Sequence, residues 1–223
     1  MPAAGNWSPA QGLWTPDLFL TANLILVGLL YTWGVVRVRR RGQPWSGWRT
    51  TFFVLALVLL ALVYLGPPET LAHTFFWAHM AQHLVVMMLA APFIVLSCPV
   101  ALLVWATDGA TRRSVVRALR SPIARFLVNP VFTWLLFAGT LLLSHVQPAM
   151  EWTLRDHDAM AFVERPLYLV AALLFYYPLV GNDMCPKRPR PAIRLASLAL
   201  MMIPETVLGM IVFFSDRKST RLN

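Results

Sequence analysis

Charged residues and cysteines are scarce in this sequence. Only 13% of its 223 residues are Asp, Glu, Lys or Arg, whereas 58% are hydrophobic, and there are two cysteines. Soluble domains carry about 25% charged residues, so this composition argues against a soluble protein. Glycine-rich phosphate-binding loops and a Ser-His-Asp pattern are also missing. No hydrolase or transferase site is therefore indicated, and we expect a protein that is not an enzyme.

Internal repeats, long linkers and low-complexity stretches are absent as well. One integral-membrane domain over residues 1–215 is the simplest interpretation. The first 17 residues contain no Lys or Arg, which argues against a secretory signal peptide. We therefore expect the first apolar block to be a retained helix.

Long apolar blocks are what the sequence does contain. A helix needs about 20 apolar residues to cross the ~30 Å hydrocarbon layer, and in a helix every backbone polar group is satisfied internally. The blocks do not alternate in hydrophobicity, as barrel strands would. The sequence predicts an all-α fold, a polytopic transmembrane helix bundle. Its six expected spans are residues 18–36, 51–65, 74–96, 126–145, 163–180 and 193–214.

Prolines and capping residues mark positions along these blocks. Asn129-Pro130 and Ser121-Pro122 each read as an N-cap followed by proline at the first helical position. Pro92 and Pro204 lie inside blocks, where proline is expected to kink a helix.

Basic residues gather in alternate loops, which is the positive-inside pattern. The first, third and fifth loops hold most of them: Arg37, Arg39, Arg40, Arg41, Arg49, Arg112, Arg113, Arg117, Arg120, Arg125, Lys187, Arg188, Arg190 and Arg194. The pattern predicts an outside N-terminus and cytoplasmic odd loops. Topology and attraction to lipid headgroups then explain the net charge of +9, so no nucleic-acid partner is expected.

The two cysteines, Cys98 and Cys185, fall near the predicted cytoplasmic side. A disulfide is not expected in that compartment. A metal-handling thiol pair is the alternative to two unrelated reduced cysteines.

Histidines are predicted to lie on the outer side, opposite to the arginines. His79 and His83 are four residues apart, so they share one helix face and can bind a single metal ion. Imidazole together with thioether sulfur is a copper-type ligand set. The candidate metal ligands are His79, His83, His145 and His157, with Met80, Met87 and His73 as accessory residues. The alternatives are histidines that only bond a neighbouring helix and methionines that only pack.

Glu205 follows Pro204 within the sixth block. An acidic residue inside a membrane is a functional candidate by default. It could bond a histidine and fix its tautomer, take part in a proton relay, or lock the bundle by pairing with Arg or a backbone group.

An ordered set of motifs resembles bacterial CtaG-type cytochrome c oxidase assembly proteins, over roughly residues 18–215. The matching residues are His79-Met80-Ala81-Gln82-His83, Pro92, Leu96-Ser97-Cys98-Pro99, Asn129-Pro130, His145 with Pro148, and His157. The resemblance implies a bacterial plasma-membrane protein that helps to assemble a haem–copper terminal oxidase by handling copper. It also implies oxidase subunits or copper chaperones as partners, besides the lipid bilayer.

Two features depart from this family. Relatives commonly carry Glu-His where this chain has Glu164-Arg165, which puts a ligand role at residue 165 in doubt. Relatives usually continue to a seventh helix, so we expect that a seventh helix is missing here and that residues 216–223 are not native.

Two other functions are compatible with the sequence. A haem-binding membrane redox protein could take its axial ligands from His83 and His145. A transporter of small solutes or metals ranks lower because such proteins often show internal repeats.

Overall fold

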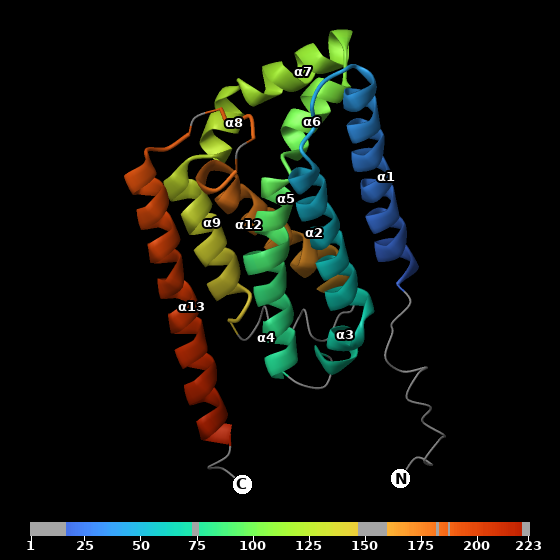
Figure 1. Ribbon diagram of the computed structural model, residues 1–223. Helices are drawn as coiled ribbons and strands as arrows, with labels where there is room; N and C mark the ends of the chain where they lie inside the picture. Colours follow the sequence, from blue (N-terminus) through green and yellow to red (C-terminus); the bar gives the residue numbers. More distant parts are fainter. Residues whose placement is uncertain (1–16, 73–75, 147–159, 182, 187, 220–223) are drawn as a thin grey trace, which may run out of the picture. The chain divides into compact units, whose positions relative to one another are not determined.

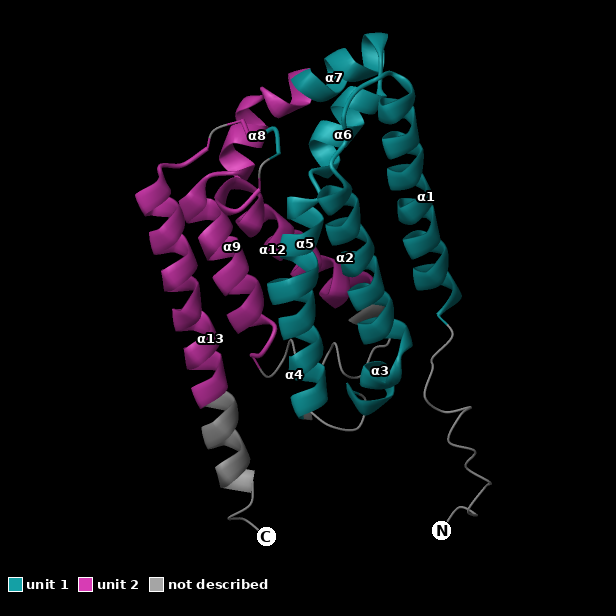
Figure 2. Cartoon of the chain, viewed as in Figure 1, with its two compact units in different colours: residues 1–116, 182–184 teal, residues 117–181, 185–223 magenta. Residues whose placement is uncertain are grey.

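The computed structural model describes residues 17–72, 76–146, 160–181, 183–186 and 188–219, and all regular structure within these ranges is helical (Figure 1). The all-α prediction is therefore confirmed. The chain forms two compact units (Figure 2). The first contains Met1–Val116 with the short segment Asn182–Met184, and the second contains Arg117–Gly181 and Cys185–Asn223.

The helical elements of the first unit run between two opposite ends of that unit. Its elements are α1 (Leu18–Arg40), α2 (Gly47–Leu65), α3 (Pro67–Ala72), α4 (Phe76–Val85), the π-helical turn η1 (Val86–Ala90), α5 (Ala91–Leu96), α6 (Pro99–Ala106) and most of α7 (Gly109–Leu119). Figure 1 shows α3 and α4 at one end of this unit and α6 and α7 at the other. The arginine-rich end of α1 lies at the α7 end.

Proline and an unusual backbone conformation shape the long apolar stretch from α4 to α6. Pro92 lacks an N–H to give to the preceding turn, and η1 comes directly before it. The distortion expected at Pro92 thus takes the form of a widened π-helical turn. Cys98 has φ 55° and ψ 54°, which is left-handed and separates α5 from α6. Pro99 then begins α6 with a backbone already suited to a first helical residue.

An aromatic core joins α1 to α2 and α6. Tyr31 stacks on Phe53 with ring centroids 3.7 Å apart, and its hydroxyl donates to the Ser97 carbonyl oxygen at 3.0 Å. Trp45 meets Trp105 edge-on at 5.8 Å. Because these contacts combine a large buried area with a satisfied hydroxyl, they fix the ends of the three helices relative to one another.

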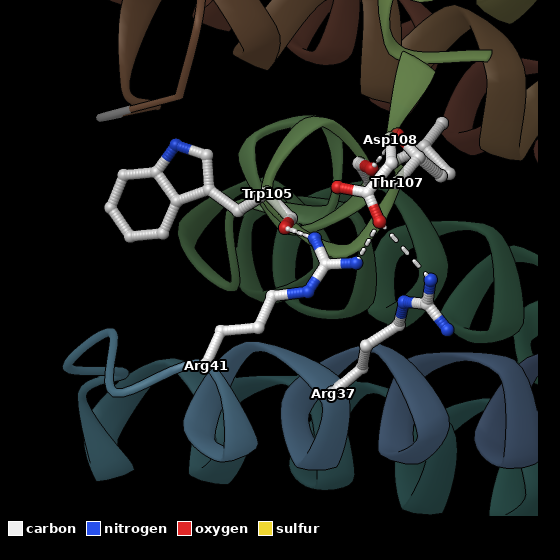
Figure 3. Close-up of polar contacts among 6 residues, drawn as sticks. Arg37, Arg41, Trp105, Thr107 and Asp108 are labelled. Atoms are coloured by element: carbon white, nitrogen blue, oxygen red, sulfur yellow. Dashed lines mark hydrogen bonds and ion pairs between the residues drawn. The ribbon is translucent and has the colours of Figure 1, made fainter. Parts of the chain in front are cut away.

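Two arginines at the end of α1 converge on the turn after α6 (Figure 3). Arg37 pairs with Asp108 at 3.2 Å, and Arg41 pairs with the same carboxylate. Arg41 also donates to the carbonyl oxygen of Trp105 at 3.0 Å. The end of α1 is thereby linked to the α6–α7 turn.

The second unit consists of α8 (Pro122–Leu127), α9 (Pro130–Leu143), the π-helical turn η2 (Met160–Glu164), α12 (Arg165–Leu179) and α13 (Pro191–Ser219). Within this unit α9 packs against both α12 and α13. Phe137 of α9 meets Phe175 of α12 with ring centroids 4.9 Å apart. This pair lies in the buried core of the unit.

Both predicted helix starts in this region are confirmed. The Asn129 side chain accepts from the Val131 N–H at 2.9 Å, and Pro130 is the first residue of α9. Ser121 Oγ accepts from the Ala124 N–H at 3.1 Å, and Pro122 begins α8.

Within the described residues, four helical stretches are long and apolar enough to cross a membrane: Leu18–Arg40, Gly47–Leu65, Trp77–Ala106 and Pro191–Met210. The chain thus has the helices of a membrane protein, but six spans are not confirmed. The fourth block forms α9, whose 14 residues make it a shorter apolar helix. The fifth block forms α12, which has 15 residues.

Candidate metal-binding site

The imidazoles of His79 and His83 meet on one face of α4. Both side chains are buried, and their Nε2 atoms are 2.9 Å apart. The rings stand nearly perpendicular, at 83°, with centroids 4.4 Å apart. The helical spacing of four residues therefore produces the pairing that the sequence predicts.

The Nε2···Nε2 distance fits two chemical states. In one, a ring N–H donates to the lone pair of the other ring, so the two tautomers are complementary. In the other, both nitrogens bind one ion, because two ligands about 2.0–2.1 Å from a metal stand about 2.9 Å apart when their bonds meet at a right angle. The distance alone does not distinguish between the two states.

A buried amide and carboxylate brace the same helix. Gln82 Nε2 donates to Glu69 Oε2 at 2.9 Å and to the Val63 carbonyl oxygen at 2.8 Å. Gln82 and Glu69 are both buried. These two bonds tie α4 to α2 and α3 immediately beside His83. A carboxylate in this corner of the first unit also favours a nearby cation.

Sequence reasoning missed this bracing contact. Glu69 is not among the predicted site residues, and Gln82 is predicted only as part of the family motif. A glutamine between two histidines on one helix face is a signal that could have drawn attention to it. Its partner, 13 residues away, could not be read from that spacing.

The accessory methionines differ in their surroundings. Met80 is half-buried on α4, and Met87 is almost fully buried. Met87 lies within the π-helical turn η1, so the spacing of a regular α-helix does not give its position relative to His83. Turns of this kind occur often at functional sites.

His145 lies two residues after the end of α9 in the second unit, and one of its ring nitrogens is hydrogen-bonded. Its Nδ1 is 2.7 Å from the Leu141 carbonyl oxygen, which can only accept, so Nδ1 carries the proton. Ser144 Oγ bonds the Tyr168 hydroxyl at 2.5 Å and lies 3.0 Å from the same Nδ1. A metal-ligand role for His145 stays a prediction.

A pocket of about 390 Å³ lies beside this cluster, between α9 and α12. Its wall is mostly apolar. It is lined by Leu135, Leu136, Gly139, Thr140, Leu143, Ser144, Val163, Glu164, Leu167 and Tyr168. Tyr168 is not among the predicted site residues. The sequence feature that could have pointed to it is its spacing of four residues from Glu164, which places the two on the same helix face.

The remaining predicted residues are placed as follows. Glu205 is half-buried on α13. The Tyr176 hydroxyl donates to Met201 Sδ at 3.4 Å. A contact between Glu205 and a histidine stays a prediction. His73 and His157 lie outside the described residues. Cys98 is buried and Cys185 is half-buried, and the two interpretations of these cysteines stay open.

Comparisons with known proteins relate most of the chain to one family. The family model of the cytochrome c oxidase caa3 assembly factor (Caa3_CtaG) matches residues 29–220. An uncharacterized protein of Mycobacterium leprae is 27% identical over 197 residues, which are 85% of this chain and 30% of that protein. An uncharacterized protein of Mycobacterium bovis is 26% identical over 183 residues, which are 79% of this chain and 28% of that protein. The chain thus spans less than a third of the length of these relatives, and no solved structure gives a significant match.

Proposed function

The chain belongs to the cytochrome c oxidase caa3 assembly factor family, and on this premise we propose that it binds copper for a haem–copper oxidase at His79 and His83. The observation that carries the proposal is the buried pair of Nε2 atoms 2.9 Å apart. Histidine is the commonest metal ligand in proteins, and imidazole suits copper. Copper is here a cargo that the protein receives and passes on.

The position of the pair supports handling at the outer membrane face. Within the first unit, α4 lies at the end opposite to the arginine-rich end of α1 (Figure 1). Lys- and Arg-rich ends of membrane helices favour the cytoplasmic side. The histidines of α4 would then face the outside of a bacterial plasma membrane.

The ligand set suits transfer. Two imidazoles occupy only part of the coordination shell of a copper ion, so the other positions are open to ligands from a donor or an acceptor. The accepting protein is an oxidase subunit, and the donor is a copper chaperone. His145, His157, Met80 and Met87 remain candidate further ligands, with His73 and Glu205 in accessory roles.

Copper titration of the purified full chain tests the site. We expect the His79→Ala/His83→Ala double variant to bind copper at least about tenfold more weakly than the natural chain, because both nitrogen ligands are removed. The measurement is competition against a chelator of known affinity, for Cu(I) and for Cu(II) separately.

The matched control is Trp77→Ala/Leu84→Ala, which removes two exposed side chains from the same helix. It should bind copper as the natural chain does. Circular dichroism and size-exclusion chromatography show whether each variant is folded. Equal copper affinity in the folded double histidine variant would falsify the proposed site.

A further inference from the structure

A strongly basic segment follows the long apolar stretch that ends at Ala106. Residues 109–127, which form α7 and α8, contain five arginines and no Asp or Glu. The arginines are Arg112, Arg113, Arg117, Arg120 and Arg125. A segment with this charge needs an anionic partner or water around it.

Neither of the two helices contributes a buried side chain to the protein. The apolar residues Ile123 and Phe126 of α8 are 69% and 59% exposed. By contrast, α6, which comes directly before, has four buried residues. Phe126 does contact Phe132 of α9, with ring centroids 4.5 Å apart. Packing within the described residues therefore accounts for only part of the apolar surface of this segment.

The helix α7 is amphipathic. Arg113 and Arg117 are four residues apart and exposed on one face. Val115 and Leu119, also four residues apart, lie on another face and are partly shielded. Figure 1 shows α7 turning away from the direction of α1 and α6. A basic stripe beside an apolar stripe is the pattern of a helix that lies in a membrane surface.

We propose that the segment 109–127 lies in the headgroup layer of the bilayer and binds anionic phospholipid there. The arginines pair with lipid phosphates. Val115 and Leu119 of α7 and Ile123 and Phe126 of α8 reach the boundary with the acyl chains. This interaction is separate from the proposed copper function.

The position of the segment favours lipid over an acidic protein partner. Gly109 follows only three residues after Ala106, where a 30-residue apolar stretch ends. A helix that begins so close to the end of a span starts at the depth of the headgroups. Clusters of four to eight Lys or Arg next to a span are the usual sign of anionic-lipid binding.

Hydrogen–deuterium exchange of the full chain in nanodiscs tests this proposal. One set of discs contains phosphatidylcholine alone, and the other contains one third phosphatidylglycerol. We expect the amides of residues 109–119 to exchange about tenfold more slowly in the anionic discs. The difference should shrink in 0.5 M salt because salt screens the attraction.

The Arg113→Gln/Arg117→Gln variant should lose most of this lipid dependence. The matched control is Arg39→Gln/Arg40→Gln, which removes the same charge from two other exposed positions and should keep it. Leu119→Ser should speed exchange in both lipids, because the proposed contact of Leu119 with the acyl chains is apolar and does not depend on lipid charge. Equal exchange of the natural chain in both disc types, or a lipid dependence that survives in the Arg113/Arg117 variant, overturns the proposal. Slow exchange that appears only when a partner protein is added would assign the segment to that partner instead.

Discussion

Asp183 shows how one side chain outside the spans organises helices far from it in sequence. Its carboxylate accepts from the Val100 N–H at 2.9 Å, the Ala101 N–H at 2.6 Å and the Met184 N–H at 2.7 Å. The first two are among the N–H groups that the first turn of α6 leaves without a helical partner. The side chain is almost fully buried. Burial raises the pKa of Asp183, while these three donors and Arg49 act in the opposite direction.

Removal of this carboxylate should weaken the first unit. We expect Asp183→Ala to lower the free energy of unfolding by about 2–3 kcal/mol, because buried N–H groups lose a charged acceptor. Denaturant titration in detergent, followed by circular dichroism, measures the change. A loss well below 1 kcal/mol would contradict this role.

The Asp183→Asn variant should reveal the pKa shift. Because the folded-state pKa is raised, the folded chain holds the proton more tightly than the unfolded chain. The stabilisation from protonated Asp183 is present below the ordinary pKa and is lost as pH rises through the raised value. Asn cannot ionise, so the Asp183→Asn variant does not lose this stabilisation. Its free energy of unfolding relative to that of the natural chain should therefore increase as pH rises through the raised pKa of Asp183. No change in the relative stability between pH 4 and pH 8 would argue against the raised pKa.

At the scale of elements, the end of α1 depends on charge pairing with the turn between α6 and α7. Arg41 and Arg37 hold the pKa of Asp108 below its ordinary value of 3.8, mainly through the hydrogen bond from Arg41. The folded state therefore binds the proton less tightly than the unfolded chain does. The resulting stabilisation is present above the ordinary pKa and is lost as pH falls through the lowered value.

Asp108→Asn should therefore lower Tm at pH 7 by about 1–3 °C, a small effect because the pair is exposed to solvent. The difference from the natural chain should diminish as pH falls below 3.8. Differential scanning fluorimetry across this range measures it. Arg39→Gln at the same helix end is the control, and it should leave Tm unchanged at both pH values. A Tm difference that is independent of pH would show that charge pairing is not the cause.

At the scale of the whole molecule, the histidine pair and the arginine-rich helix end lie at opposite ends of the first unit (Figure 1). This polarity is consistent with the proposed handling of copper on one side of a membrane. The buried contacts of Gln82 hold α4 in place at that end. Assembly of the oxidase should therefore depend on the chain most strongly when copper is scarce.

A deletion strain of the host tests this dependence. The natural gene should restore oxidase activity and oxidase copper content at low copper, whereas the His79→Ala/His83→Ala gene should restore less than about a tenth. Added copper should partly compensate for the variant by mass action. Complementation with Arg39→Gln/Arg40→Gln serves as the control. If the histidine variant restores full activity at low copper while membranes contain it in normal amounts, copper binding at this pair is not the function.

Much of the fold could be read from local patterns. Helix starts at Asn129-Pro130 and Ser121-Pro122 follow from a side-chain oxygen and a fixed φ angle within a few residues. The pairing of His79 with His83 follows from helical periodicity alone. Six spans are not confirmed, and α9 and α12 are shorter than the apolar blocks that contain them.

Several features follow from local sequence: a helical chain that is apolar enough for a membrane, the starts of α8 and α9, the pairing of two histidines, and the family. Each of these rests on composition, an ordered set of motifs or residues a few positions apart. Other features emerge only when the helices pack: Asp183 caps α6 from 82 residues away, Gln82 bonds Glu69, and Tyr168 bonds Ser144. These contacts depend on which helices pack together and on the rotation of each about its axis. Hydropathy specifies neither the pairing nor the rotation of the helices, because apolar faces can pack in many registers. Buried polar groups favour the one register in which their hydrogen bonds are formed.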